Sequence, residues 1–96
     1  MIIRIVKLTF QPEKADDFTG IFSEQKKNIL AFDGCMHVEL WKATNCDNVF
    51  FTYSKWRDST SLEHYRNSDF FRSTWARAKA LFSEKAEAWS VTVADI

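Results

Sequence analysis

The sequence predicts an α+β fold in which a four-stranded antiparallel sheet carries helices on one face. The chain has 96 residues, which suffice for one compact domain over residues 1–96 and are too few for two. Hydrophobic periodicity alternates between two and about 3.6 residues, in the order strand, helix, strand, strand, helix, strand. The chain contains only two glycines and one proline, so few residues interrupt this pattern. Aromatic residues make up 16% of the chain.

The first strand is predicted over residues 2–10, where apolar side chains fall on both faces. One face carries Arg4 together with the apolar residues Ile2, Val6, Leu8 and Phe10. The other face carries Ile3, Ile5, Lys7 and Thr9. Apolar residues on both faces are expected of a strand that is covered on both sides.

A long amphipathic helix is predicted over residues 13–32. Pro12 suits its first turn, because the N–H that proline lacks needs no partner there. The apolar stripe of this helix consists of Ala15, Phe18, Ile21, Phe22, Gln25, Ile29 and Phe32. Gly34 follows, and we expect it to adopt a left-handed conformation that caps the helix.

A β-hairpin is predicted next, with strands over residues 35–42 and 49–56. In the first strand, one face is formed by Met36, Val38 and Leu40, and the other by His37, Glu39 and Trp41. The second strand is rich in β-branched and aromatic residues. The polar residues 43–48 form the turn between them.

Two helices and a last strand complete the prediction. Residues 60–63 match a capping box at the start of a short helix that runs to about Asn67. In this motif Thr60 bonds the backbone of the first turn, and the Glu63 side chain reaches back to the backbone N–H of Thr60. Ser68 is predicted to cap the next helix, whose inward face carries Phe71, Trp75, Ala78 and Phe82. The last strand is predicted over residues 86–94.

This order of elements, with short connections and right-handed crossovers, predicts the ferredoxin-like βαββαβ topology with both helical segments on one side of the sheet. The other face of the sheet then exposes apolar residues such as Ile3 and Ile5. A second copy that packs sheet to sheet would cover this open face and close a dimeric α/β barrel. We therefore expect a homodimer through the open sheet face.

The composition excludes several classes of protein. Thirteen basic and thirteen acidic residues give a net charge of zero, which argues against nucleic-acid binding by bulk electrostatics. No stretch approaches about 20 apolar residues, so no membrane segment is expected. Cys35 and Cys46 form no CxxC motif and no ligand cluster with His37 or His64, so we expect free thiols, no metal site and a cytoplasmic location.

Several landmarks of the chain resemble those of the antibiotic biosynthesis monooxygenase family of dimeric α/β-barrel proteins. Residues 8–14 resemble the family's first strand running into a proline-containing helix start, and residues 34–35 resemble its Gly-Cys step into the second strand. Residues 53–56, 61–65 and 68–71 resemble its strand-end tryptophan followed by two short helices. The resemblance extends over essentially all 96 residues.

The resemblance implies a pocket between the helices and the sheet. Many members of the family act on quinols, anthrones or other aromatic compounds without a metal or flavin, because the deprotonated substrate passes an electron to oxygen itself. The protein then supplies a dry apolar pocket, correct orientation and a polar group for the proton. We therefore expect a cofactor-independent monooxygenase that acts on a small quinol- or anthrone-like substrate, with no cofactor.

Tyr65 and Arg4 are the candidate catalytic residues. Tyr65 lies three residues after Leu62 and shares its inward side, whereas His64 points almost opposite. Tyr65 could hydrogen-bond a phenolic substrate, or be a core aromatic with its hydroxyl bonded to backbone. Arg4 could stabilise an oxyanion or a phenolate, or extend to water. The predicted pocket residues are Val6, Trp56, Tyr65, Phe70, Phe71 and Trp75.

Some relatives degrade haem, and the sequence argues against this reaction here. Trp75 stands where the resemblance places their iron-ligating histidine, and an indole nitrogen carries a hydrogen and cannot ligate iron. Val6 stands where those relatives carry a polar amide. Phe70 and Ser54 replace a histidine and an acidic residue that are common among relatives of the quinol type.

Two other functions are open to this sequence. A non-catalytic dimer of the same fold would bind an apolar ligand or act as a scaffold, and in a scaffold its own Trp and Phe side chains would fill the pocket. RNA binding on the strand 49–53 is disfavoured, because the glycines of the RNA motif are absent and the net charge is zero. An open cavity between Tyr65, Trp75 and the sheet would favour ligand binding, whereas contact between these rings would favour a scaffold.

Overall fold

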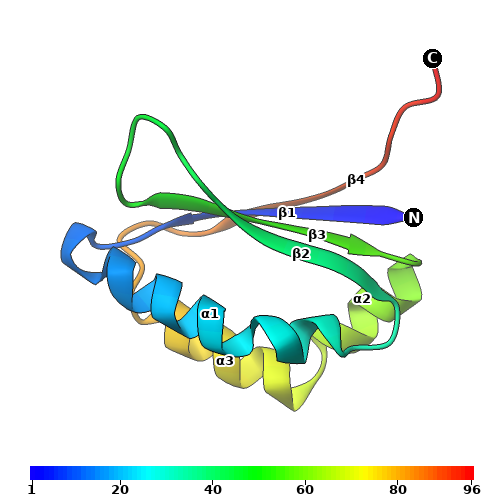
Figure 1. The fold of residues 1–96 in the computed structure, drawn as a ribbon, viewed down its shortest axis with the longest axis horizontal. Helices are drawn as coiled ribbons and strands as arrows, with labels where there is room; N and C mark the ends of the chain where they lie inside the picture. Colours follow the sequence, from blue (N-terminus) through cyan, green and yellow to red (C-terminus); the bar gives the residue numbers. More distant parts are fainter.

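A four-stranded antiparallel sheet forms one layer of the protein and the helices form the other, in a computed structural model that describes all residues, 1–96 (Figure 1). The strands are β1 (Ile2–Thr9), β2 (Cys35–Lys42), β3 (Val49–Trp56) and β4 (Glu87–Val91). The helices are α1 (Ala15–Leu30), which follows the short 3-10 turn η1 (Pro12–Lys14), α2 (Ser59–Arg66) and α3 (Asp69–Lys79). The strand order β2-β3-β1-β4, with every neighbouring pair antiparallel, confirms the predicted ferredoxin-like topology.

The helix-facing side of β1 forms the centre of the core. Leu8 and Phe10 are almost completely buried, and the Phe10 ring stacks on Phe18 of α1 with 4.4 Å between ring centroids. Phe10 also meets Phe50 of β3 edge to face at 5.9 Å. The face of β1 that carries Arg4 is therefore the helix side, as the alternation predicted, and α1 packs on it through its predicted stripe.

The turn between α1 and β2 depends on Gly34. The N–H of Cys35 donates to the carbonyl of Phe32, and Gly34 lies inside this turn with φ 86°. The predicted left-handed conformation is confirmed, but α1 has already ended at Leu30, so the glycine shapes the entry to β2 instead of the helix end. The side chain of Ser61 packs against the α-carbon of Gly34, and this contact brings α2 close to the turn.

The start of β2 differs from the predicted alternation. The register shifts between Cys35 and His37, and the β-bulge leaves Met36 57% exposed. A bulge adds one unpaired residue to a strand and so changes which side chains face the core. Met36 therefore does not share the core face with Val38, while Cys35 pairs with Trp56.

Two further boundaries were predicted incorrectly. The N-cap of α2 is Asp58, whose carboxylate accepts the N–H of Ser61 at 2.8 Å, so Thr60 lies inside the helix and does not cap it. A carboxylate is a strong cap, and its charge is favourable at a helix N-terminus. The strand β4 ends at Val91, which pairs with Ile3, so it is shorter than the predicted strand over residues 86–94.

Other local predictions hold. The Ser68 hydroxyl accepts the N–H of Phe71 at 3.1 Å and caps α3, as expected. Cys35 and Cys46 are free thiols. No helix in the structure combines the length and the apolar character that crossing a membrane requires.

We expect Gly34→Ala to lower the free energy of unfolding by about 2 kcal/mol or more, because a left-handed backbone is strained for alanine and the new methyl group would collide with Ser61. Gly20→Ala in α1 is the matched control. Its methyl group would meet no atom within 4 Å, and alanine favours a helix by about 0.5–1 kcal/mol. Urea unfolding measures both variants, and equal stability of the two would contradict this account of the turn.

Candidate functional site

An apolar cavity of about 300 Å³ lies between the helices and the sheet. Twenty-one residues line it, and 15 of them are hydrophobic. All four strands or their flanking residues and all three helices contribute to its wall, so the cavity is a product of the whole fold. Its volume is at the lower end of the range of about 300–1,000 Å³ that ligand pockets occupy, which favours a small ligand.

The sheet side of the wall consists of two rows of side chains that run across the strands. One row contains Val38, Ser54, Arg4 and Ser90, and the next contains Leu40, Thr52, Val6 and Ala88; all of these except Ser90 and Leu40 line the cavity. The helix side is formed by Phe18, Ile21, Phe22, Gln25 and Ile29 of α1 and by residues of α2 and α3. Five of the seven residues of the stripe predicted for α1 therefore line the cavity.

Five of the six predicted pocket residues line the cavity: Val6, Trp56, Tyr65, Phe71 and Trp75. Phe70 does not line it and instead packs on Phe32, with ring centroids 5.6 Å apart. Consecutive residues of a helix point about 100° apart, so Phe70 is directed away from the cavity when Phe71 points into it. The expectation that Phe70 belongs to the pocket was therefore wrong.

A continuous row of aromatic rings borders the cavity, from the end of β3 through α2 to α3. Trp56 stacks on Tyr65 at 4.9 Å, Tyr65 meets Phe71 edge to face at 5.1 Å, and Phe71 stacks on Trp75 at 5.7 Å. Tyr65 and Trp75 are thus joined along the wall through Phe71 and do not close the space by contact with each other. This open cavity favours ligand binding over a scaffold whose own rings fill the interior.

The hydroxyl of Tyr65 forms no hydrogen bond within the chain, although the side chain is mostly buried. No buried side-chain polar atom of the structure lacks a partner, so this oxygen keeps accessible surface, in a residue that lines the cavity. Burial raises the pKa of Tyr65 well above its usual range, and the nearby Cys35 raises it further. Tyr65 is therefore a neutral phenol that can donate or accept a hydrogen bond but is a poor general base.

Arg4 places a positive charge in the wall. Its Nη1 donates to the hydroxyl of Ser90 on the neighbouring strand at 3.0 Å. Partial burial lowers the pKa of Arg4 most, the positive charge of Arg66 lowers it further, and Glu63 raises it. A guanidinium stays protonated at neutral pH, so this charge is permanent and incompletely hydrated.

Ser54 positions the buried indole at one end of the cavity. Trp56 has no exposed surface, and its Nε1–H donates to the Ser54 hydroxyl at 3.0 Å. The Ser54 hydroxyl in turn lies 3.5 Å from the carbonyl oxygen of Arg4, to which it donates. A buried tryptophan needs such an acceptor for its N–H. A neutral serine supplies it here, so this row of the wall carries no negative charge.

Sequence reasoning missed Arg66, which also lines the cavity. Its spacing could have revealed it, because Arg66 follows the inward Leu62 by four residues and Tyr65 by one. No histidine, aspartate or glutamate lines the wall, and His64 is exposed, as its position on the helix predicted. No group of three potential metal-ligating side chains lies together anywhere in the structure.

The fold is similar to that of solved structures with distant sequences. An antibiotic biosynthesis monooxygenase gives a TM-score of 0.91 at 15% identity, over 99% of this chain and 100% of that chain. A conserved protein from Methanosarcina mazei Go1 gives 0.87 at 21% identity, over 95% and 91%. SnoaB, a cofactor-independent oxygenase from Streptomyces nogalater, gives 0.85 at 15% identity, over 99% and 94%. At these identities the similarity establishes the fold alone.

Sequence comparison identifies the family to which the chain belongs. No match is found among curated proteins. The sequence profile described as antibiotic biosynthesis monooxygenase matches residues 1–77, which include β1, α1, β2, β3, α2 and most of α3. This range contains every polar residue that lines the cavity. The chain therefore belongs to the antibiotic biosynthesis monooxygenase family.

Proposed function

We propose that this protein is a cofactor-independent monooxygenase that oxidises a small quinol- or anthrone-like substrate in the cavity between the helices and the sheet. One observation carries the proposal: the cavity is apolar and open, and its wall holds an unpartnered phenol and a guanidinium. Family membership supports this activity, and a structural neighbour is a cofactor-independent oxygenase.

The proposed reaction begins when the bound substrate loses a proton and passes one electron to molecular oxygen. The two radicals combine to a peroxide, which then loses water. For a methylene carbon, both C–H bonds and the O–O bond break, one oxygen atom becomes the new carbonyl and the other leaves as water. Oxygen is thus the only oxidant, and the protein contributes binding, orientation and electrostatic stabilisation.

The proposed role of Arg4 follows from the absence of histidine, aspartate and glutamate from the wall, because no side chain there is suited to accept the substrate proton. A positive charge in a poorly hydrated site stabilises a substrate anion and so lowers the pKa of the substrate. The substrate can then lose its proton to water without a protein base. Tyr65, held neutral by burial, donates a hydrogen bond to the substrate oxygen and orients the ring.

One observation favours a second candidate, a non-catalytic dimer that binds an apolar ligand. The wall contains no histidine or carboxylate, which are the side chains that most often transfer protons in enzymes. Oxygen consumption separates the two functions, because a binding protein would hold the substrate without accelerating its oxidation.

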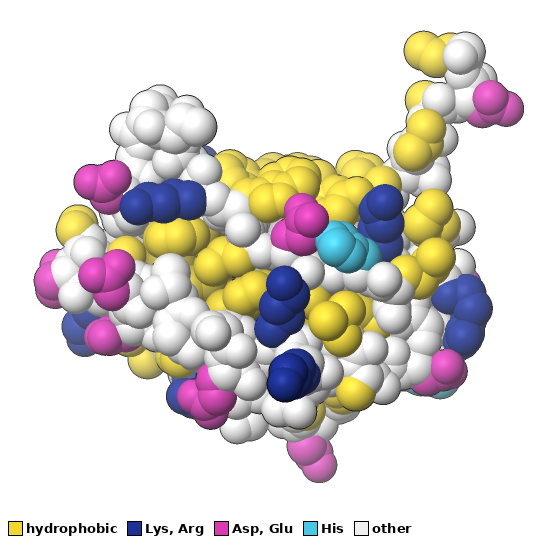
Figure 2. All heavy atoms as spheres, viewed as in Figure 1, with side chains coloured by type: hydrophobic (Ala, Val, Ile, Leu, Met, Phe, Trp, Pro, Cys, Tyr) yellow, Lys and Arg dark blue, Asp and Glu magenta, His cyan; other side chains and the backbone are white.

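We also propose a homodimer through the open sheet face. Side chains on this face form rows in which Tyr53, Ile5 and Trp89 lie side by side. Trp41 and Trp89 are 41% and 45% exposed, and Figure 2 shows apolar atoms gathered along the sheet side of the molecule. The loop between β2 and β3 and the C-terminal tail both rise on this side, at opposite ends of the sheet (Figure 1). A second copy would cover this face and leave the cavity, on the opposite face, unobstructed.

We expect Tyr65→Phe to lower kcat/KM for oxygen consumption by up to about tenfold, because one hydrogen bond to the substrate is lost. A panel of anthrones and quinols with an oxygen electrode measures the effect. Tyr53→Phe is the matched control, since it removes the other tyrosine hydroxyl of the chain from the opposite face of the sheet. No oxygen uptake by the wild type with any substrate would refute the enzyme function, and equal rates for both variants would refute the role of Tyr65.

Arg4→Gln should move the alkaline rise of the rate to higher pH by about one unit, because an adjacent positive charge lowers the pKa of an acid by about 1–3 units. Arg4→Lys retains the charge and should keep the midpoint near that of the wild type. A pH–rate profile measures this shift independently of any general loss of activity. An unchanged midpoint in Arg4→Gln would show that Arg4 does not stabilise the substrate anion.

Ile5→Lys should convert the dimer into a monomer, because it places a charge at the centre of the open sheet face. Sedimentation equilibrium should give twice the 11.3 kDa chain mass for the wild type and a single chain for the variant. Ala76→Lys, on the exposed side of α3, is the control and should remain dimeric. A wild type that sediments as a single chain at micromolar concentration would overturn the proposed dimer.

A further inference from the structure

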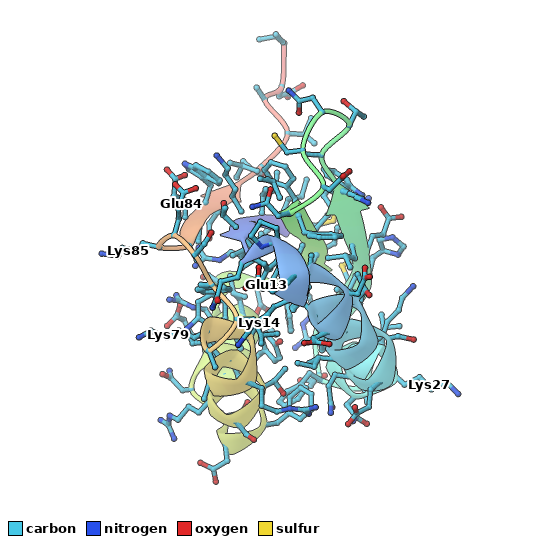
Figure 3. The ribbon with its side chains drawn as sticks, turned by 90° about the vertical axis from the view of Figure 1, so that its left-hand side faces the viewer. Glu13, Lys14, Lys27, Lys79, Glu84 and Lys85 are labelled. Atoms are coloured by element: carbon cyan, nitrogen blue, oxygen red, sulfur yellow. The ribbon has the colours of Figure 1, made fainter.

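The charge of the cavity wall is one-sided. Arg4 and Arg66, here called the arginine pair, are the only charged residues among the 21 that line it. The whole chain has 13 basic and 13 acidic residues and a net charge of zero. The wall, with two positive charges and no negative one, differs from this overall balance. Other cations lie on the outside: Lys27, Lys79 and Lys85 point away from the body of the molecule (Figure 3).

The two guanidinium groups of the arginine pair are close enough to repel each other. The positive charge of Arg66 is the second cause, after burial, of the lowered pKa of Arg4. Arg4 uses Nη1 to bind Ser90, and Arg66 uses Nη1 to bind Glu63. A guanidinium has five N–H donors, so both groups keep donors for a ligand.

The ion pair of Arg66 with Glu63 does not account for its place in the wall. The pair joins atoms 3.0 Å apart between side chains that are 42% and 56% exposed, and such exposed pairs contribute little. Glu63 itself does not line the cavity. Arg72 and Asp69 form the same i,i+3 pair at 3.2 Å on α3, and Arg72 does not line the cavity either.

A substrate with one negative charge would engage only one of the two arginines, and Arg66 would keep only its exposed ion pair with Glu63. If the ionised substrate oxygen or carbon lies at Arg4, as proposed above, Arg66 remains at the wall with free donors, and its side chain is 42% exposed. Carboxylates suit this position, because guanidinium and carboxylate form parallel, charge-assisted hydrogen bonds. The ligand would then have an apolar aromatic part inside the cavity and an acidic substituent at Arg66.

We propose that Arg66 is a specificity residue, and that the arginine pair selects an aromatic substrate that carries a carboxylate in addition to its oxidisable ring. This inference rests on the proposed function, since it assumes that the cavity takes an aromatic ligand. It names the substrate class as hydroxylated aromatic acids in preference to neutral quinols.

The test compares two probes that differ by one carboxylate, 2,5-dihydroxybenzoate and 1,4-dihydroxybenzene, under anaerobic conditions by isothermal titration calorimetry. We expect the affinity of the wild type for the acid to be at least about tenfold higher than for the neutral quinol, because a hydrogen bond between charged groups contributes that much to binding. Arg66→Gln should lose most of this preference and retain its affinity for the neutral quinol. Arg66→Lys should retain part of the preference, and Arg72→Gln, the matched control, should bind both probes like the wild type.

The outcomes separate this inference from the proposed function. Equal wild-type affinity for the two probes would overturn the carboxylate preference and leave the aromatic site standing. A preference that survives in Arg66→Gln, or an equal loss of both ligands in that variant, would overturn the assignment to Arg66. Failure of the wild type to bind either probe would count against the proposed function as well.

Discussion

The packing of Phe10 is the contact on which the two-layer structure depends. Its ring is fully buried and meets Phe18 of α1, Phe50 of β3 and Phe82 beyond α3, so one side chain joins the sheet to α1 and to the segment that follows α3. A second aromatic contact, in which Trp56 stacks on Tyr65, joins the sheet to α2. Between these two contacts, the side chains of the sheet and the helices enclose a space of about 300 Å³ that they do not fill. The cavity is the space that remains.

The electrostatics of the cavity follow from its mostly neutral wall. Ser54 satisfies the buried indole of Trp56 without introducing a charge, and burial keeps Tyr65 protonated. Arg4 therefore acts in a poorly hydrated environment, whereas Arg66 is partly exposed and pairs with Glu63, which lies outside the wall. Charge interactions are stronger in such an environment than in water. A site of this kind is suited to stabilising anions, and it differs from one in which a histidine or carboxylate removes the proton.

The two faces of the sheet serve two separate purposes in this account. Because side chains alternate along a strand, Arg4 and Val6 of β1 face the cavity while Ile3 and Ile5 face away from the helices. The proposed dimer contact and the proposed substrate contact thus share a backbone but no side chain. Each can be altered by substitution with little direct effect on the other.

Local patterns in the sequence determined the order of elements, the inward faces of β1 and α1, the left-handed turn at Gly34 and the cap at Ser68, because each depends on neighbouring residues alone. Tertiary pairing decided the rest. The bulge at Met36 depends on how β2 pairs with β3, and the extent of β4 depends on its pairing with β1. Asp58 caps α2 in place of the predicted Thr60, and Arg66 enters the wall while Phe70 leaves it. The period of a helix is local, but only docking against the sheet selects which side chains point at the cavity.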